Sequence, residues 1–295
     1  MSTGAPMMEG KVCVVTGATA GIGTETARAL ARMGATVVIV ARDPAKSART
    51  VDEIEASVPN AKVDVVLADF ASLAAVRAGA AEIARRYSAV HVLVNNAGLA
   101  MKHRTLSADG FELTFAVNHL APFLLTRALM PQLRAGAPSR IVTVASGAEG
   151  YGPIDFDDLQ SEKNYRGFRA YGKSKLANVL FTYELATRLA GSGITANCLH
   201  PGAVATDLLR KLPRLIFMLI SPFLLSPEQG AATQIFLAIS PQVDGVSGGY
   251  FVKCRAARSS PRSYDVSARK RLWEMSEALV DSRMGIDSTD NTRAW

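Results

Sequence analysis

The sequence predicts an α/β fold in which helices cover both faces of one doubly wound parallel sheet. Short β-branched runs alternate with amphipathic helical stretches along most of the chain. Such alternation implies right-handed β-α-β units, and these units build a parallel sheet. The chain has 295 residues, of which 48% are hydrophobic and 20% are charged. We therefore expect a single domain with a substantial buried core.

The first predicted strand, residues 11–16, runs into a glycine-rich turn. The glycines have the spacing Gly17-x-x-x-Gly21-x-Gly23, and a helix that ends near Gly34 follows them. Glycines let the backbone approach a pyrophosphate, and a helix N-terminus supplies free N–H groups and the positive end of a dipole. The spacing differs from Gly-x-Gly-x-x-Gly and from the lysine-containing P-loop. We predict a Rossmann-type dinucleotide site here, with a plain tight turn as the alternative.

The second predicted strand, residues 36–41, ends at Arg42. Many NAD-binding folds place an acidic side chain at this point, where it holds the ribose 2′-hydroxyl. An arginine can instead pair with a 2′-phosphate through charge-assisted hydrogen bonds. Arg42 therefore favours NADP over NAD, although the adjacent Asp43 weakens the signal. The alternative is that Arg42 is a solvated turn residue.

The next stretch continues the alternation. We predict helices over 44–58 and 71–87 and strands over 62–67 and 90–94. The third strand leads into Asp69 and Phe70, at a turn that can flank an adenine ring. The fourth strand ends in Asn95-Asn96-Ala97-Gly98. Two amides and a glycine at that place suit either a ligand crevice or a hydrogen-bonded turn.

Four further polar residues follow in helices and at a strand end. A long helix predicted over 107–134 carries Asn118, which needs a hydrogen-bonding reason within an apolar stretch. A fifth strand, 140–145, places Ser146 at its carboxyl end. Tyr171 and Lys175 project from one face of a later helix, where the ammonium favours phenolate and lowers the pKa of the phenol. From a reference of ~10, this brings the hydroxyl toward the range of general acid–base catalysis. Alone, the pair is more typical of a packed tyrosine beside a surface lysine.

Together these motifs resemble the short-chain dehydrogenase/reductase family over nearly the whole chain. They occur in the family's order: Thr16-Gly-x-x-x-Gly-x-Gly23, Asn95-Asn-Ala-Gly98, Asn118, Ser146, Tyr171-x-x-x-Lys175 and Pro201-Gly-x-x-x-Thr206. Each motif is weak alone, but the ordered set is specific. The segments 118–126, 174–181 and 268–277, and the long interval between Ser146 and Tyr171, are similar to the retinol dehydrogenase-like branch.

The resemblance implies a role for each member of a catalytic set. Tyr171 protonates the carbonyl oxygen as hydride arrives, or acts as the base in the reverse direction. Lys175 lowers the pKa of Tyr171 and holds the nicotinamide ribose, and Ser146 polarises the substrate oxygen. Asn118 holds a water that links Lys175 to solvent, and Thr206 bonds the nicotinamide carboxamide. The implied cofactor-binding residues are Gly17, Thr19, Ala20, Gly21, Ile22, Gly23, Arg42, Asp69, Phe70, Asn96, Tyr171, Lys175, Val204 and Thr206. No metal ion is required, and no cluster with ligand spacing occurs in the sequence.

The remaining sequence contains the expected substrate-facing region. An apolar segment, 215–225, is too short to span a bilayer. The resemblance implies that it belongs to a substrate lid over about 207–226, while an interfacial membrane patch and a buried helix are alternatives. Around it we predict strands over 194–199 and 248–252 and a helix over 229–239. The dinucleotide-binding domain is expected over 1–253, and 254–295 forms an extension with one helix, near 267–280, packed on the same domain.

The leading hypothesis is an NADP(H)-dependent oxidoreductase that interconverts an alcohol and an aldehyde or ketone. An apolar lid favours lipophilic substrates that are retinoid-, steroid- or long-chain-like. Because fold does not fix function, two alternatives stay open. One is a catalytically silent NADP-binding sensor or scaffold, and the other is an epimerase that uses the same Tyr–Lys pair.

Charge and cysteine content bear on partners and compartment. The net charge is +7, but no nucleic-acid motif accompanies it, so we expect no nucleic-acid partner. The three cysteines have no metal-type spacing, and the first residues show no signal-peptide pattern, which favours the cytoplasm. Members of the family often form homodimers through the helices that carry Asn118 and Tyr171. The resemblance therefore implies a homodimer, unless the extension alters that face.

Overall fold

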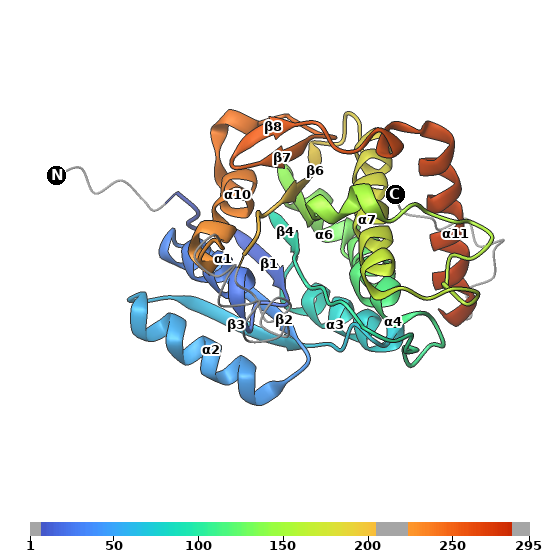
Figure 1. The fold of residues 1–295 in the computed structure, drawn as a ribbon. Coiled ribbons are helices and arrows are strands. Elements are labelled where there is room, and N and C mark those ends of the chain that lie inside the picture. The colour runs from blue at the N-terminus through green and yellow to red at the C-terminus, as the bar shows by residue number, and fades with distance from the viewer. Residues whose placement is uncertain (1–6, 205–223, 285–295) are drawn as a thin grey trace.

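An eight-stranded sheet forms the centre of the molecule, and helices cover both of its faces (Figure 1). The structure, a computed structural model, describes residues 7–204 and 224–284. The strand order is β3-β2-β1-β4-β5-β6-β7-β8, and neighbouring strands are parallel except β7 and β8. The predicted doubly wound α/β fold is confirmed. The strands are β1 (Val12–Thr16), β2 (Thr36–Ala41), β3 (Lys62–Leu67), β4 (Val92–Asn95), β5 (Ser139–Val144), β6 (Ile194–His200), β7 (Tyr250–Val252) and β8 (Arg255–Ala257).

The helices follow the predicted alternation along the chain. The α-helices are α1 (Gly21–Arg32), α2 (Pro44–Ser57), α3 (Leu73–Arg86), α4 (Leu113–Phe115), α5 (Ala121–Ala128), α6 (Met130–Ala135), α7 (Gly167–Arg188), α10 (Pro227–Ile239) and α11 (Val266–Met284). Shorter turns are the π-helical η1 (Ala116–Leu120) and the 3-10 helices η2 (Gly147–Tyr151), η4 (Pro241–Val243) and η5 (Pro261–Tyr264). None of the described helices is long and apolar enough to cross a membrane.

Buried side chains alternate between the two faces of the sheet. Val14 of β1 and Val38 of β2 belong to a core with residues of α3, α5, α7 and α11. Their neighbours Cys13 and Val15 belong to a second core with residues of α1, α2 and α10. Consecutive strand residues point to opposite faces, so a continuously apolar strand fills both cores. This explains why the β-branched runs were readable as buried parallel strands.

The prediction of one continuous helix over 107–134 is wrong. The helical stretch begins at Leu113 and passes through the π-helical η1, where the N–H of Ala121 donates to the carbonyl of Ala116. Pro122 gives the physical reason, because it has no N–H for an α-helical bond to Asn118 and its ring crowds that carbonyl. A second proline, Pro131, coincides with the break between α5 and α6.

Strand β8 was missed by the sequence analysis. It pairs antiparallel with β7 through a two-residue turn, in which Lys253 and Cys254 have φ of 50° and 59°. Such hairpin turns favour Asn-Gly or Gly-Gly, so a Lys-Cys turn gives no recognisable signal. The C-terminal extension therefore supplies a strand to the sheet as well as the predicted helix.

The helix of the extension, α11, packs against the molecule rather than standing apart. The Trp273 ring stacks on Phe181 of α7 at 5.8 Å between ring centroids and lies edge-on to Phe123 of α5 at 5.0 Å. Arg127 of α5 forms an ion pair with Asp281 at 2.6 Å. The helices implicated in homodimer formation thus have this face covered by their own chain. The predicted lid over 207–226 lies outside the described residues, except at its last three positions.

Candidate active site

The predicted site residues collect at the carboxyl ends of neighbouring strands. Gly17 follows β1, Asn96 follows β4 and Ser146 lies just beyond β5. These strands are adjacent in the sheet, and the strand order reverses direction between β1 and β4 (Figure 1). Open α/β sheets bind ligands in the crevice at such a switch point.

The glycine-rich turn packs closely against the end of β4. A Cβ on Gly17, whose φ is +65°, would lie 2.8 Å from the Cα of Ala97, and one on Gly23 would lie 2.5 Å from the Asn96 amide nitrogen. The helix that follows, α1, has no side-chain cap at Ala20 and no acidic residue in its first turn. Its free N–H groups fit an anion such as a pyrophosphate.

Three other helices, α2, α3 and α10, contrast with α1 at their N-termini. Asp43 caps α2, Ser72 caps α3 and Ser226 caps α10, each by accepting a backbone N–H. In those helices a side chain already uses an N-terminal donor. The turn that carries Thr19 and Ala20 therefore remains the one suited to a dinucleotide among these four.

Asn96 holds the glycine-rich turn in place. Its amide donates to the carbonyls of Thr16 at 2.7 Å and Gly17 at 3.2 Å, and its oxygen accepts from Gln234 of α10 at 3.3 Å. The Thr16 hydroxyl in turn accepts the N–H groups of Asn96 and Ala97, both at 3.0 Å. Sequence reasoning missed Gln234, because nothing in a helical glutamine signals a contact so distant in the chain.

Arg42 and its acidic neighbour Asp43, at the end of the crevice where the adenosine is expected, differ in their bonding. Arg42 is exposed and has no hydrogen-bond or ion-pair partner among residues 7–204 and 224–284. The Asp43 carboxylate accepts the Lys46 N–H at 3.0 Å, and this bond lowers the pKa of Asp43. Asp43 is thus used in capping α2, while the Arg42 guanidinium stays available.

The next turn differs from its predicted role in one respect. Asp69 is exposed and accepts the N–H of Ala71 at 3.0 Å. The Phe70 side chain is buried in the core and only 7% exposed. The Phe70 ring therefore does not line the crevice, since the apolar core takes it, and only its backbone remains for an adenine contact.

Lys175 and Asn118 meet at Gly98. A Cβ on Gly98 would lie 3.3 Å from both the Lys175 Nζ and the Asn118 Oδ1, so any side chain there would crowd both groups. The Lys175 ammonium donates to the carbonyl of Val144, at the end of β5, at 2.9 Å. Burial lowers the pKa of Lys175 to about 8.

The Asn118 side chain ties the π-helical η1 to two other segments. Its oxygen accepts the Leu99 N–H at 2.8 Å, and its amide donates to the Leu99 carbonyl and the Ser174 hydroxyl, each at 2.9 Å. The Ser174 hydroxyl donates to the carbonyl of Tyr171 at 2.7 Å. Both amide hydrogens of Asn118 are therefore used within the protein.

Ser146 and Tyr171 are brought together where η2 rests on α7. A Cβ on Gly152 would lie 1.9 Å from the Lys173 nitrogen, and one on Gly172 would lie 2.6 Å from the Ala148 carbonyl oxygen. The Ser146 hydroxyl accepts the Ala148 N–H at 3.2 Å. A hydrogen bond between Ser146 and Tyr171 acts to lower the pKa of the phenol.

The net direction of the Tyr171 pKa differs from the sequence-based expectation. Burial is the largest effect and raises the pKa of Tyr171, outweighing the hydrogen bond with Ser146. The Lys175 Nζ lies 5.7 Å from the centre of the Tyr171 ring. Two groups on one helix face are thus close as predicted, but the pKa of Tyr171 is set by burial and by the bond with Ser146 rather than by the lysine.

The last predicted cofactor contacts lie near α10. Val204 is buried, and a Cβ on Gly230 would lie 2.6 Å from a methyl group of Val204 and from one of Ile22. This places Val204 beside the first turn of α1. Thr206 lies outside the described residues.

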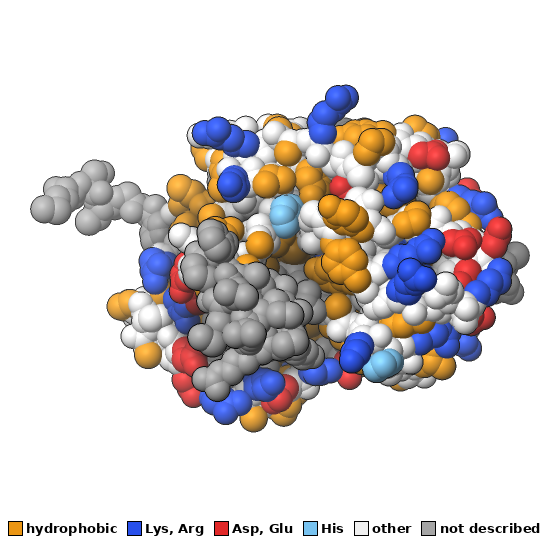
Figure 2. Space-filling view, viewed as in Figure 1, with side chains coloured by type: hydrophobic (Ala, Val, Ile, Leu, Met, Phe, Trp, Pro, Cys, Tyr) orange, Lys and Arg blue, Asp and Glu red, His pale blue; other side chains and the backbone are white. Residues whose placement is uncertain are grey.

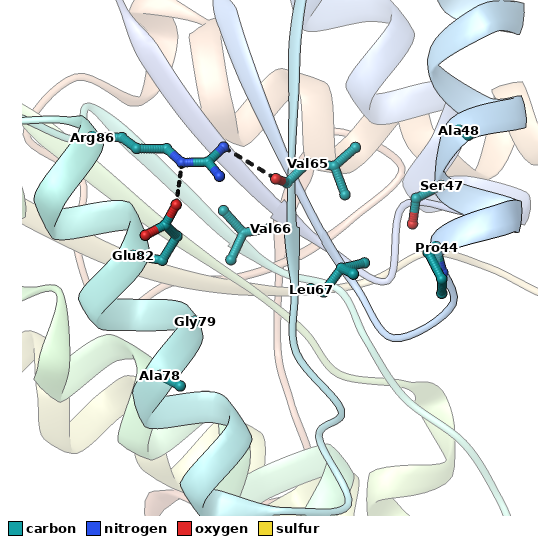
Figure 3. Close-up of a pocket in the computed structure, with 10 residues that line it drawn as sticks. All are labelled: Pro44, Ser47, Ala48, Val65, Val66, Leu67, Ala78, Gly79, Glu82 and Arg86. Atoms are coloured by element: carbon teal, nitrogen blue, oxygen red, sulfur yellow. Dashed lines mark hydrogen bonds and ion pairs between the residues drawn. The ribbon is translucent and has the colours of Figure 1, made fainter.

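A cavity of about 530 Å³ lies elsewhere, at the β3 edge of the sheet between α2 and α3 (Figure 3). Arg86 reaches across it and donates to the Val65 carbonyl at 3.2 Å and to Glu82 at 2.6 Å. Four strand spacings, roughly 19 Å, separate β3 from β5. None of the predicted catalytic residues lines this cavity.

Comparisons with known proteins show the family of the chain. The sequence model of the family described as short chain dehydrogenase matches residues 11–214. Human "Retinol dehydrogenase 12" is 44% identical over 279 residues, which cover 94% of this chain and 88% of that protein. Mouse "Retinol dehydrogenase 14" is 42% identical over 290 residues, covering 93% of this chain and 87% of that protein.

The fold is also similar to that of a solved structure. The crystal structure of an uncharacterised protein from Mycobacterium paratuberculosis has a TM-score of 0.77 and 33% identity, covering 92% of this chain and 94% of that one. The site geometry, the family match and these similarities support an oxidoreductase with a nicotinamide dinucleotide cofactor. The chain belongs to the short-chain dehydrogenase family and is similar to its retinol dehydrogenases.

Proposed function

We propose that the protein is an NADP(H)-dependent oxidoreductase that interconverts an alcohol and an aldehyde or ketone, with Tyr171 as the general acid or base. One observation carries the proposal. Near the carboxyl ends of the central strands, beside the uncapped α1, the structure brings together Ser146, Tyr171, Lys175 and Asn118. When bound, the nicotinamide supplies or accepts the hydride. The chain's own residues orient the substrate and move the proton.

Tyr171 is suited to donate that proton to a carbonyl oxygen. Because burial raises the pKa of Tyr171, its hydroxyl stays protonated near neutral pH. A protonated phenol is the form that a general acid requires. The neighbouring Ser146 hydroxyl can donate to the same carbonyl oxygen and stabilise the negative charge that develops there.

Lys175 and Asn118 are suited to resupply the proton. Burial places the pKa of Lys175 at about 8, so its ammonium can lose and regain a proton near physiological pH. Both amide hydrogens of Asn118 are already used. We therefore assign the water-binding role at this position to the Asn118 backbone carbonyl, which Pro122 cannot satisfy in an α-helical bond.

The preference for NADP rests on the separation of Arg42 from Asp43. An exposed guanidinium without a partner in the described chain can pair with a 2′-phosphate. Asp43 is held at the N-terminus of α2, so it does not compete for the ribose hydroxyl. A fold neighbour that is 26% identical, with a TM-score of 0.69 and coverage of 84% of this chain and 97% of that one, is described as the Pseudomonas aeruginosa RhlG/NADP active-site complex.

The similarity to retinol dehydrogenases supports a lipophilic substrate. We also propose that the chain does not form a homodimer through the faces of α5 and α7. The side chains of Trp273 and Asp281 from α11 already pack there. A second copy would have to displace that helix from the core.

The test is nicotinamide absorbance followed over time, with NADPH or NADH and a panel of aldehydes and ketones that includes retinal. We expect NADPH to be consumed in proportion to the alcohol formed, and faster than NADH. Product formed while the nicotinamide is recycled would point to an epimerase. Tight NADPH binding with no turnover on any carbonyl would favour the sensor.

A further inference from the structure

Two exposed aromatic rings stand together beside the proposed catalytic residues. Tyr151 is 70% exposed and Phe168 is 64% exposed, which makes them the two most exposed aromatic side chains of the described residues. Their ring centroids are 5.9 Å apart, and the rings are tilted by 49°. Tyr151 ends η2 and Phe168 belongs to the first turn of α7.

Both rings are positioned by the elements that carry Ser146 and Tyr171. The helix η2 begins directly after Ser146, so Tyr151 ends the turn that Ser146 caps. Phe168 precedes Tyr171 by three residues on α7, and residues at that spacing are neighbours on one helix face. The close approach of Gly152 to α7 joins the two elements at this point. The ring pair therefore lies within about one helical turn of Tyr171.

The pair is exposed although several other large rings of the molecule are buried. Phe115, Phe123 and Trp273 are nearly fully buried in the main core. On the face shown in Figure 2, hydrophobic side chains gather beside the central hollow. Two adjacent exposed rings present apolar area that a ligand can bury. Aromatic rings favour edge-on or offset contacts with centroids about 4.5–7 Å apart, so a third ring can pack against this pair.

We propose that Tyr151 and Phe168 form the binding surface for the apolar body of the substrate. The two rings set the preference for carbonyl compounds that carry a planar aromatic or conjugated group over those that lack one. The carbonyl lies at Ser146 and Tyr171, and the planar group extends along the two rings. This inference rests on the proposed carbonyl chemistry and names two specificity-determining residues for the same site.

The experiment compares two aldehydes that differ in the apolar body. kcat/KM is measured for cinnamaldehyde, which is planar and conjugated, and for propanal, with NADPH saturating. The variants are Tyr151→Ser, Phe168→Ser, the double variant, and Phe168→Leu, which keeps an apolar side chain without the ring. We expect the double variant to lose about 10- to 100-fold on cinnamaldehyde, since two ring contacts are removed, and less than about twofold on propanal. Phe168→Leu should fall between wild type and Phe168→Ser.

Tyr264, the last residue of η5, offers a matched control because its ring packs against α7 away from Tyr171. Its ring lies 5.8 Å from that of Tyr183, and its side chain is 48% exposed. Tyr183 is twelve residues beyond Tyr171 on α7, which corresponds to about 18 Å along the axis. Tyr264→Ser should therefore leave both aldehydes unaffected.

A binding measurement separates this inference from the proposed function. The Kd of cinnamyl alcohol, which cannot react with NADPH, is measured by calorimetry in the presence of NADPH. A weaker Kd in the double variant supports the ring pair even if no aldehyde is turned over, in which case only the proposed reaction fails. Equal losses on both aldehydes, or an unchanged Kd and unchanged selectivity, overturn the inference while leaving a reductase in place. A dimer of wild type that dissociates in the double variant, measured by sedimentation, assigns the rings to a second copy and also overturns it.

Discussion

The Nε2 of His119 lies 2.8 Å from the hydroxyl of Ser276, so the residue beside Asn118 is bonded to the C-terminal helix α11. The Ser276 hydroxyl donates its single hydrogen to the Leu272 carbonyl at 2.7 Å. It must therefore accept from His119, which fixes the proton of the neutral imidazole on Nε2. Both side chains are buried. The extension is thus joined to the segment that carries a proposed catalytic residue.

Removing the Ser276 hydroxyl should destabilise the protein. Ser276→Ala leaves a buried N–H of His119 without an acceptor, and such groups cost about 1–3 kcal/mol. The free energy of unfolding is measured by urea denaturation. Ser282→Ala is the matched control, because Ser282 is exposed on the same helix and its hydroxyl bonds the Leu279 carbonyl at 2.8 Å. It should change stability by less than about 0.5 kcal/mol. Equal effects of the two variants would contradict the importance of the buried bond.

His119 should make stability fall in mild acid. Burial lowers the pKa of His119 from 6.5 to about 3, so the unfolded chain binds a proton at pH values where the folded chain does not. The stability due to this residue is complete above the unfolded pKa and is lost as the pH falls from about 6.5 toward 3. Unfolding of wild type and His119→Gln is compared between pH 7 and pH 4.5. Below the unfolded-state pKa of His119, the free energy of unfolding of the wild type should fall by about 1.4 kcal/mol more per pH unit than that of the variant. Parallel curves would show that His119 does not titrate this way.

Arg42→Ala should weaken NADPH without affecting NADH. A charge-assisted bond to a phosphate is worth about 10- to 100-fold, so KM for NADPH should rise by that factor. Asp43→Asn is the control, because an asparagine can still cap α2 and no cofactor contact is assigned to Asp43. It should leave the ratio of the two cofactors unchanged. An Arg42 variant that keeps its preference for NADPH would remove the basis of the NADP assignment.

The pH profile of carbonyl reduction should have a falling limb set by Lys175. The ammonium supports the reaction, and burial lowers its pKa to about 8, so kcat/KM should fall as the pH rises through that value. Lys175→Arg should move the limb to higher pH, because a guanidinium stays protonated, at a reduced maximal rate. Tyr171 and Lys175 interact, so the measured value belongs to the pair. A limb that does not move in the variant would assign the titration to another group.

The strands and the order of the motifs could be predicted because they depend on local sequence. The runs at 36–41 and 62–67 coincide with β2 and β3. The β-branched residues of β2 fill cores on both faces of the sheet, whereas in β3, at the sheet edge, only Val66 is buried. The order of the motifs was predicted, but the approach of Lys175 and Asn118 to Gly98 is known only from the structure.

Features that depend on tertiary environment were not predictable in the same way. The rise in the Tyr171 pKa comes from burial, and a spacing of four residues carries no measure of burial. The burial of the Phe70 ring in the core and the contact of Gln234 with Asn96 also depend on the tertiary environment. By contrast, the π-helical turn before Pro122 had a local signal in that proline.

The measurement that tests the central claim most directly is turnover and NADPH binding by Tyr171→Phe. The substitution removes one hydroxyl and keeps the ring, so NADPH should still bind with nearly unchanged affinity, as followed by its fluorescence. Reduction of the best aldehyde should fall by about 10²- to 10⁴-fold, the usual contribution of a general acid. A variant that binds NADPH and reduces the aldehyde at a rate close to wild type would contradict the assignment of Tyr171 as the proton donor.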